Sequence, residues 1–304
     1  MSNKPMPVKF VFNPDAGRPG DSPRQLVEIL REMQKQNILP EVFVIKKGES
    51  PKTVIKRAKK DDTRLIVVSG GDGTIEHVAH SMIGHGITLG LIPTGTRNNL
   101  ALNLGIPNDI PKAVKLLRQG HVEKIDVGVA RSGGESRPFL EVTTLGLLSD
   151  LYFVTDDIQH GDLSKVGEFI SKFVASIPFA AKIKLDGHRK VMTTAFMILV
   201  ANMAYLGANI QIDPSVSYQD GKLDVFIFTE LSKINLVSYA LRSMAGDVQD
   251  KALQHYRARE ITIDPQPSVA TIADGFQLTD GRLSVKIKPR ALRVITSRNS
   301  KSAR

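Results

Sequence analysis

The sequence predicts an α/β protein of two domains, a parallel-sheet domain followed by an antiparallel, β-rich domain. Three observations support this prediction. The chain has 304 residues, more than a typical single domain contains. Up to about residue 126, short apolar runs alternate with helical patterns, which is typical of a parallel sheet covered by helices. After that point the apolar runs follow one another with Asp-Gly pairs among them, which is typical of antiparallel strands.

The first region contains four apolar runs that we expect to be parallel strands. After the third run, for example, Ile75, Val78 and Met82 recur at the spacing of one helix face. We expect strands at Val8–Phe12, Glu41–Ile45, Leu65–Val68 and Thr88–Ile92. We expect helices at Leu26–Met33, Pro51–Lys59, Ile75–Met82, Leu100–Leu104 and Ile110–Gln119.

The second region is predicted to consist mainly of antiparallel strands. Expected strands are Phe139–Val142, Lys182–Leu185, Ala195–Val200, Leu223–Phe228, Glu260–Ile263 and Leu283–Ile287, with helices at Lys165–Ser176 and Lys233–Met244. An Asp-Gly pair supplies the positive φ that tight hairpin turns require. Four such pairs occur, at Asp186-Gly187, Asp220-Gly221, Asp274-Gly275 and Asp280-Gly281. We therefore expect domains at 1–127 and 128–290, with segment 291–304 returning to the first.

The charge of the chain favours anionic partners. Its net charge is +10 and its pI is about 9.7, as expected of a protein that meets nucleotides, nucleic acid or an acidic membrane surface. Aromatic residues make up only 6%, and no RNA-binding pattern of interleaved aromatics occurs, so we expect no nucleic-acid partner. The sequence leaves the oligomeric state open, a homodimer included.

The sequence predicts a cytoplasmic location, with peripheral contact at the inner membrane face. There is no cysteine, so disulfides and thiolate metal sites are excluded. The N-terminus lacks the apolar core of a signal peptide. The most apolar stretch, Ala195–Ala201, is too short to cross a bilayer.

Three predicted strands of the first region end in polar loops that contain glycine. These loops are residues 13–17 (NPDAG), 69–74 (SGGDGT) and 93–99 (PTGTRNN). The carboxyl ends of parallel strands line the crevice where such sheets bind ligands. Glycine lets the backbone approach a phosphate closely, and the helix that follows presents unpaired N–H groups. The three loops together therefore predict a phosphate-binding site.

The second loop does not match the two best-known phosphate-binding patterns. Position 76 is Glu, so the loop is not G-x-G-x-x-G, and no G-x-x-x-x-G-K-[ST] motif is present. These departures argue against a dehydrogenase and a P-loop NTPase. A tight strand-to-helix turn without a ligand is the remaining alternative, although such a turn needs only one glycine.

The two loops resemble a known family. The stretch IVVSGGDGTIEHV followed by GLIPTGTRNNLALNLGIP is similar to the diacylglycerol kinase catalytic-domain family, which includes bacterial lipid kinases and sphingosine kinases. NPDAG resembles the family's entry motif, and DPSVSYQDGKLDVFIF resembles its second-domain stretch that holds a structural metal. The similarity extends over nearly the whole chain. It implies a nucleotide-binding domain like that of NAD kinases and phosphofructokinases, which share G-G-D-G, followed by a lipid-substrate domain.

The resemblance also implies an activity and a set of site residues. It implies an ATP-dependent kinase that phosphorylates the hydroxyl of a diacylglycerol-like lipid with the help of Mg²⁺. The implied catalytic residues are Asp72 and Asp274, and a structural Mg²⁺ would be held by Asp220 with the carbonyls of Ser217 and Lys222. The implied ATP-binding residues are Asn13, Gly70, Gly71, Asp72, Gly73, Thr74, Gly95 and Thr96.

Several positions depart from the family pattern and keep alternatives open. The chain has Glu76-His77 where the family reads N-E, Asn99 where it reads Asp, and Phe276 where the D-G-E motif has Glu. Phenylalanine cannot accept a proton, so Asp72 would have to serve as the base. The alternatives are a nucleotide- or lipid-binding protein with weak or no turnover, and an NAD kinase-like enzyme.

Overall fold

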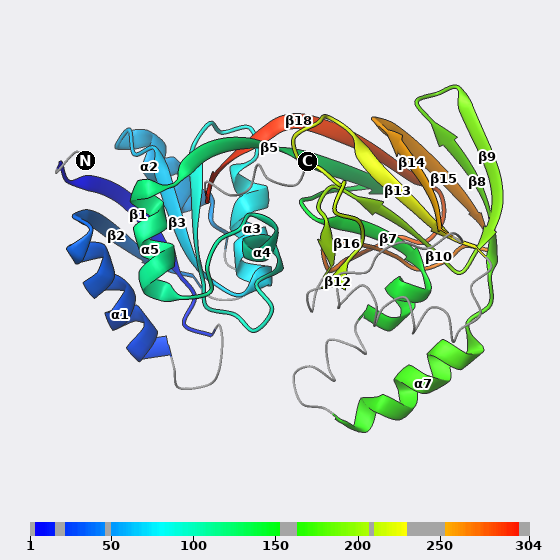
Figure 1. Cartoon of the computed structure of the whole chain (residues 1–304), viewed down its shortest axis with the longest axis horizontal. Coiled ribbons are helices and arrows are strands. Elements are labelled where there is room, and N and C mark those ends of the chain that lie inside the picture. Colours follow the sequence, from blue (N-terminus) through cyan, green and yellow to red (C-terminus); the bar gives the residue numbers. More distant parts are fainter. Residues whose placement is uncertain are drawn as a thin grey trace. The chain divides into compact units, whose positions relative to one another are not determined.

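A computed structural model describes residues 4–15, 22–45, 50–152, 163–206, 210–229 and 253–297. The chain divides into two compact units (Figure 1). Unit 1 contains the described residues up to Ile125 and from Arg290 onward, and unit 2 contains those from Asp126 to Pro289. Strand β18 contributes residues to both units, and each unit is described by itself.

Unit 1 is built on a parallel sheet. Its strands are β1 (Met6–Phe12), β2 (Ile38–Val44), β3 (Leu65–Gly70) and β4 (Thr88–Pro93), in the order β2-β1-β3-β4. The end of β18 (Leu283–Thr296) adds a further parallel strand, because Val294 pairs with Leu89 of β4. The helices are α1 (Ser22–Lys35), α2 (Lys52–Lys60), α3 (Asp72–Met82), α4 (Asn99–Asn103) and α5 (Ile110–Gln119).

The local sequence accounts for these elements. Every residue of β3 and β4 is buried, as expected of parallel strands that are covered on both faces and therefore form continuous apolar runs. Helix α5 begins where the Asp109 carboxylate accepts the N–H of Lys112 at 2.9 Å, with Pro111 in its first turn. Its buried residues Ala113, Val114 and Leu117 lie on one face, which packs on the sheet.

Unit 2 consists mainly of antiparallel strands. One sheet contains β5 (His121–Ser132), β6 (Glu135–Phe139), β8 (Phe179–Leu185), β9 (Arg189–Ala195), β15 (Glu260–Gln266) and the start of β18. A second sheet has the order β14-β13-β10-β7-β16-β17, and β11 (Tyr205–Leu206) pairs with β12 (Ile210–Gln211). The second sheet's strands are β7 (Val142–Gly146), β10 (Met197–Ala201), β13 (Leu223–Phe228), β14 (Leu253–Ala258), β16 (Thr271–Ala273) and β17 (Phe276–Leu278).

The main core of unit 2 contains side chains from both sheets, including Ile183, Ile261, Val285, Ile198 and Val225. Helical segments in this unit are η1 (Leu163–Lys165), α7 (Val166–Ala175) and residues 147–152. Across the described residues, no helix has both the length and the apolar character needed to cross a membrane.

Two of the predicted Asp-Gly turns join hairpins. Asp186 and Gly187 have φ values of 48° and 77° and connect β8 to β9, and Asp274 and Gly275, with φ values of 41° and 81°, connect β16 to β17. The predicted fold class, a parallel α/β domain followed by an antiparallel β-rich domain, is thereby confirmed. The predicted helix at Lys233–Met244 lies outside the described residues.

Two strand predictions were wrong in detail. The run Phe139–Val142 was expected to be one strand, but β6 ends at Phe139 and β7 begins at Val142. Residues 140–141 leave the ladder because their N–H groups donate to the Asp274 carboxylate. The run Ala195–Val200 is interrupted at Phe196, whose N–H donates to the carbonyl of Phe228.

Candidate functional site

The three glycine-containing loops of unit 1 begin side by side. Strand β3 lies between β1 and β4, so the loops that follow these strands start at neighbouring points of one sheet edge. The N–H of Asn13 donates to the Ser69 carbonyl at 3.2 Å, and the N–H of Thr94 donates to the Gly70 carbonyl at 3.1 Å. The structure thus brings together the predicted residues of all three loops. Residues 16–17 of the first loop lie outside the described residues.

Two glycines pack against each other where the second and third loops meet. A Cβ built on Gly95 would lie 2.4 Å from the Cα of Gly71, which is backbone and cannot move aside. Only glycine therefore fits at position 95. Gly73, in the first turn of α3, differs: a Cβ there would meet no atom within 4 Å. Gly73 borders open space beside the packed Gly71–Gly95 contact.

Helix α3 begins without a side-chain cap. Its N-cap residue is Gly71, which has no side-chain acceptor for the first N–H groups of the helix. The N–H groups of Thr74 and Ile75 donate to the Gly71 carbonyl at 3.0 and 3.1 Å. The backbone N–H groups of Asp72 and Gly73 precede them and lie at the positive end of the helix dipole. This is the arrangement that binds anions at helix N-termini.

Side chains hold the loops in place. The Asn13 side-chain amide donates to the Thr74 hydroxyl at 2.6 Å and so joins the first loop to the second. The hydroxyls of Ser69 and Thr94 are 3.2 Å apart and join the ends of β3 and β4. Thr96, a predicted ATP-binding residue, is exposed at the tip of the third loop.

Asn98 closes the third loop on itself, a role that the sequence prediction missed. Its backbone is left-handed, with φ of 54°. Its side-chain oxygen accepts the N–H of Gly95 at 3.0 Å, and its side-chain nitrogen donates to the Gly95 carbonyl at 2.9 Å. Asparagine tolerates positive φ better than most residues, which was the one available signal.

Asp72 links the second loop to the third. Its carboxylate accepts the N–H of Asn99, the first residue of α4, at 2.7 Å. Burial raises the pKa of the Asp72 carboxyl above its ordinary value, and the Asn99 hydrogen bond and the positive charge of Arg97 counteract part of that rise. Asp72 is therefore a more basic carboxylate than an exposed one. The influence of Arg97 was not predicted, and a single Arg in a loop gives no specific signal.

The second predicted catalytic residue, Asp274, lies in unit 2. It is 8% exposed and sits in the turn between β16 and β17. Its carboxylate accepts three backbone N–H groups: those of Leu140, of Glu141 at 3.1 Å and of Val142 at 3.0 Å. In this geometry the Asp274 side chain anchors the break between β6 and β7.

The predicted metal-binding loop also lies in unit 2, just before β13. One oxygen of Asp220 accepts the N–H of Lys222 at 2.9 Å, and the other forms an ion pair with Arg257. The Ser217 hydroxyl accepts the N–H of Gln219 at 3.3 Å. No group of three or more His, Cys, Asp or Glu side chains able to hold a metal ion occurs in the described part of the chain. Arg257 already balances the Asp220 carboxylate, and the buried carboxylate of Asp126, which borders the same loop, accepts the Gly221 N–H at 2.7 Å.

Comparisons with known proteins identify both halves of the chain. The family model of the diacylglycerol kinase catalytic domain matches residues 7–130, and that of the YegS C-terminal NAD kinase beta sandwich-like domain matches residues 159–296. The chain is 24% identical over 276 residues to the diacylglycerol kinase of Bacillus subtilis strain 168, covering 88% of this chain and 89% of that protein.

Solved structures show the same fold. A Bacillus anthracis protein described as a proposed diacylglycerol kinase superposes with a TM-score of 0.77 at 26% identity, covering 98% of this chain and 99% of that chain. An NAD kinase from Archaeoglobus fulgidus, solved in complex with ATP, superposes with a TM-score of 0.53 at 12% identity, covering 97% of this chain and 95% of the other. The second likeness shows that the fold is NAD kinase-like.

Proposed function

Because the chain belongs to the diacylglycerol kinase catalytic-domain family, we propose that it transfers the γ-phosphoryl group of ATP to a hydroxyl of a diacylglycerol-like lipid. The observation that carries this proposal is the packed contact of Gly71 with Gly95 beside the uncapped start of α3. Because neither glycine has a Cβ, the backbone N–H groups beside this contact form a cradle that a phosphate can approach closely.

The nucleotide would bind at this cradle through its phosphates. The N–H groups of Asp72 and Gly73 would donate to phosphate oxygens, and the open space beside Gly73 would admit them. Asn13 and Thr74, already hydrogen-bonded to each other, would border the same phosphates. The fold neighbour from Archaeoglobus fulgidus, solved in complex with ATP, supports the choice of nucleotide.

Mg²⁺ fits the same place on chemical grounds. A half-buried carboxylate and a triphosphate would repel each other unless a cation lay between them, and hard cations prefer carboxylate and phosphate oxygens. The phosphate oxygens would hold the ion close to Asp72, and the ion offsets phosphate charge when it is bound. The Asp72 oxygen that does not accept the Asn99 N–H stays available for the proton of the lipid hydroxyl.

Asp72 is also the proposed base. As the lipid hydroxyl oxygen forms a bond to the γ-phosphorus, the bond from that phosphorus to the β-γ bridging oxygen breaks and ADP leaves. The hydroxyl proton goes to the Asp72 carboxylate, whose raised pKa makes it a better proton acceptor than an ordinary Asp. For Asp274 we propose a positioning role, since its carboxylate is occupied by three N–H groups.

A second candidate function is nucleotide or lipid binding with weak turnover, and Phe276 favours it. This residue occupies the position of the family's D-G-E glutamate, and its ring is 36% exposed, with the Arg137 guanidinium 5.6 Å from its centroid. An aromatic ring at that position offers no proton acceptor. An NAD kinase-like activity has the shared fold and the shared G-G-D-G motif in its favour.

Radiolabelled ATP incubated with diacylglycerol in neutral detergent micelles tests the proposal. We expect labelled lipid from the wild type and at least a ~100-fold loss of rate in Asp72→Asn, since removing a general base costs about that much. Asp62→Asn is the matched control, because Asp62 is exposed and pairs only with Arg64 among the described residues. ATP binding without labelled lipid from any headgroup class tried would favour the second candidate. Full activity of Asp72→Asn would refute the assigned base.

A further inference from the structure

Unit 2 contains a sheet with one apolar face and one polar face. Along β8 the residues alternate, so that Ile183 and Leu185 are buried in the core whereas Lys182 and Lys184 are exposed. Strands β15 and β18 repeat this alternation, with Thr262 and Ser284 on the polar side. We call the polar side the outer sheet face; its residues are Arg131, Lys182, Lys184, Lys190, Met192, Thr262, Asp264, Glu260, Arg282, Ser284 and Lys286.

Strand register joins these residues into rows. Ser284 is opposite Thr262, Thr262 is opposite Lys184, and Lys184 is opposite Lys190. In the next row Asp264 is opposite Lys182, and Lys182 is opposite Met192. Directly opposed residues on one face of a sheet have their Cβ atoms about 5 Å apart. The cations therefore form a continuous surface.

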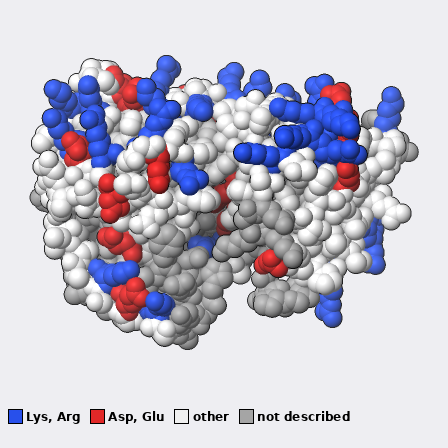
Figure 2. Space-filling view, turned by 180° about the vertical axis from the view of Figure 1, so that it is seen from behind, with Lys and Arg blue, Asp and Glu red and all other residues white. Residues whose placement is uncertain are grey.

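Positive charge dominates this surface. It has six cations, and its two carboxylates are Glu260 and Asp264. Glu260 pairs with Lys286 at 3.0 Å. Within the described ranges, Lys182, Lys184 and Lys190 have no ion pair. In Figure 2, where the reversed view puts the β8–β9 hairpin on the left, Lys and Arg side chains gather at the upper left and also at the upper right.

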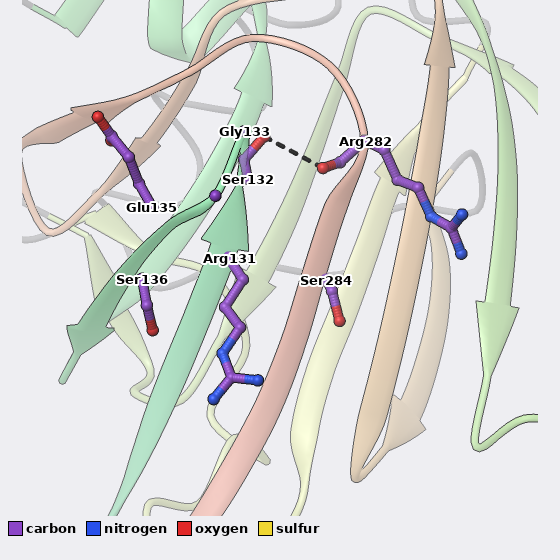
Figure 3. A pocket seen from close by; sticks show the side chains of 8 residues that line it. Arg131, Ser132, Gly133, Glu135, Ser136, Arg282 and Ser284 are labelled. Atoms are coloured by element: carbon purple, nitrogen blue, oxygen red, sulfur yellow. Dashed lines mark hydrogen bonds between the residues drawn. The ribbon is translucent and has the colours of Figure 1, made fainter.

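A pocket of about 370 Å³ adjoins the outer sheet face at the β5–β6 turn (Figure 3). Arg131 of β5 lies alongside Ser284 of β18, and Arg282 extends from the same end of β18. Neither guanidinium has an ion pair with any described residue. The walls are held together by Ser132, whose buried hydroxyl donates to the Thr279 carbonyl at 2.6 Å and lies 3.1 Å from the Arg282 carbonyl.

From this geometry we infer that the outer sheet face docks on an anionic phospholipid bilayer, with Arg131 and Arg282, whose guanidinium groups point in different directions in Figure 3, each contacting a lipid phosphate. Unpaired Lys side chains gain attraction near an anionic leaflet, and guanidinium groups match phosphate oxygens in shape. Met192, on the edge strand β9 and opposite Lys182, is 74% exposed and supplies an apolar side chain that can enter the lipid interface. Nucleic acid is the less suitable occupant, since none of the face residues named above is aromatic.

Vesicle flotation of the full chain tests the surface. Vesicles of phosphatidylcholine with phosphatidylglycerol should bind the wild type, and pure phosphatidylcholine should not. Lys182→Glu/Lys184→Glu should weaken binding by ~20-fold or more, given about fivefold per Lys near the surface. The matched control is Lys112→Glu/Lys115→Glu on α5, which changes the charge equally on exposed residues of unit 1 and should bind almost as the wild type does.

The pocket has its own pair of variants. Arg131→Gln/Arg282→Gln should weaken binding several-fold, and Arg24→Gln/Arg31→Gln on exposed positions of α1 should weaken it less. If the test and control pairs lost vesicle binding equally, the effect would depend on net charge alone, and the proposal would be overturned. Binding of a single-stranded oligonucleotide that the sheet variants lose, with vesicle binding unchanged, would overturn it as well. Lys182→Gln/Lys184→Gln repeats the test without introduced carboxylates, and thermal melts check folding.

This inference deepens the proposed function and rests on it for the choice of a lipid surface, but the two can fail separately. Phosphoryl transfer in neutral detergent micelles needs no anionic bilayer, so the sheet variants should keep wild-type activity there. Absence of phosphoryl transfer by the wild type would refute the kinase proposal, and the vesicle comparison would remain valid. If the sheet variants bound vesicles as the wild type does, the docking proposal would be refuted and the kinase proposal would stand.

Discussion

The pairs Asp72-Gly73 in unit 1 and Asp274-Gly275 in unit 2 have the same two residues in opposite surroundings. Asp72 begins a helix, its carboxylate accepts the Asn99 N–H, and the glycine that follows it borders open space. Asp274 lies in a hairpin turn with its carboxylate enclosed by three N–H groups, and a Cβ on Gly275 would lie 2.6 Å from the Tyr152 hydroxyl. The comparison teaches that surroundings, and not the residue pair, separate the proposed ligand site from a structural turn.

The largest expected effect is at the glycine contact of unit 1. Gly95→Ala should abolish ATP binding and cost about 1–3 kcal/mol of unfolding free energy, because its Cβ would overlap the Gly71 backbone. Gly73→Ala is the matched variant. It should keep or slightly raise stability, since Ala favours helix by up to ~1 kcal/mol, while its methyl group weakens ATP binding. Calorimetric titration with ATP and denaturant melts measure both. Normal ATP binding by Gly95→Ala would disprove the cradle.

The next effect concerns the enclosed carboxylate of unit 2. Asp274→Asn should destabilise the protein by about 2–3 kcal/mol, because one of the three N–H groups would then face a side-chain NH₂ donor. Urea melts measure the loss. Activity per folded molecule should stay within about tenfold of the wild type if Asp274 only positions residues 140–142. A loss as large as that of Asp72→Asn would instead show that Asp274 takes part in the reaction.

A smaller effect is expected in the pH dependence of stability when Asp72 is replaced. Burial penalises the charged form of Asp72 and so raises its pKa. The charged carboxylate therefore lowers the stability of the folded state. This loss of stability is absent below the ordinary Asp pKa and complete above the raised pKa. Asp72→Asn removes the penalty and keeps an oxygen for the Asn99 N–H. The melting temperature of the variant minus that of the wild type should therefore increase as the pH rises above the ordinary Asp pKa of about 4. A difference that does not change with pH would contradict a raised pKa for the Asp72 carboxyl.

The smallest expected effect is at the predicted metal loop. If Mg²⁺ binds at Asp220, a chelator should lower the melting temperature of the wild type by roughly 2–4 °C, which corresponds to about 1 kcal/mol. Asp220→Asn should show no such shift. An unchanged melting temperature in the wild type would mean that Arg257 alone balances the Asp220 carboxylate.

Much of unit 1 could be predicted because its signals are local. Each buried parallel strand is a continuous apolar run, and each loop predicted to bind phosphate follows its strand directly, as residues 71–74 follow β3. Unit 2 was less predictable in detail. The strand expected at Phe139–Val142 is interrupted by a carboxylate more than 130 positions away in the chain. A periodicity argument uses only neighbouring residues and cannot detect such an acceptor.

The sequence by itself determined the fold class and the position of the candidate phosphate site, because periodicity and glycine loops encode both over short distances. Only the tertiary structure decided which Asp-Gly pair borders open space and which is enclosed, and that the cations of β8, β9 and β18 share one face. These properties depend on strand register and on contacts between distant segments. Register and long-range contacts arise when sheets close on a common core, so no single stretch of the chain contains them.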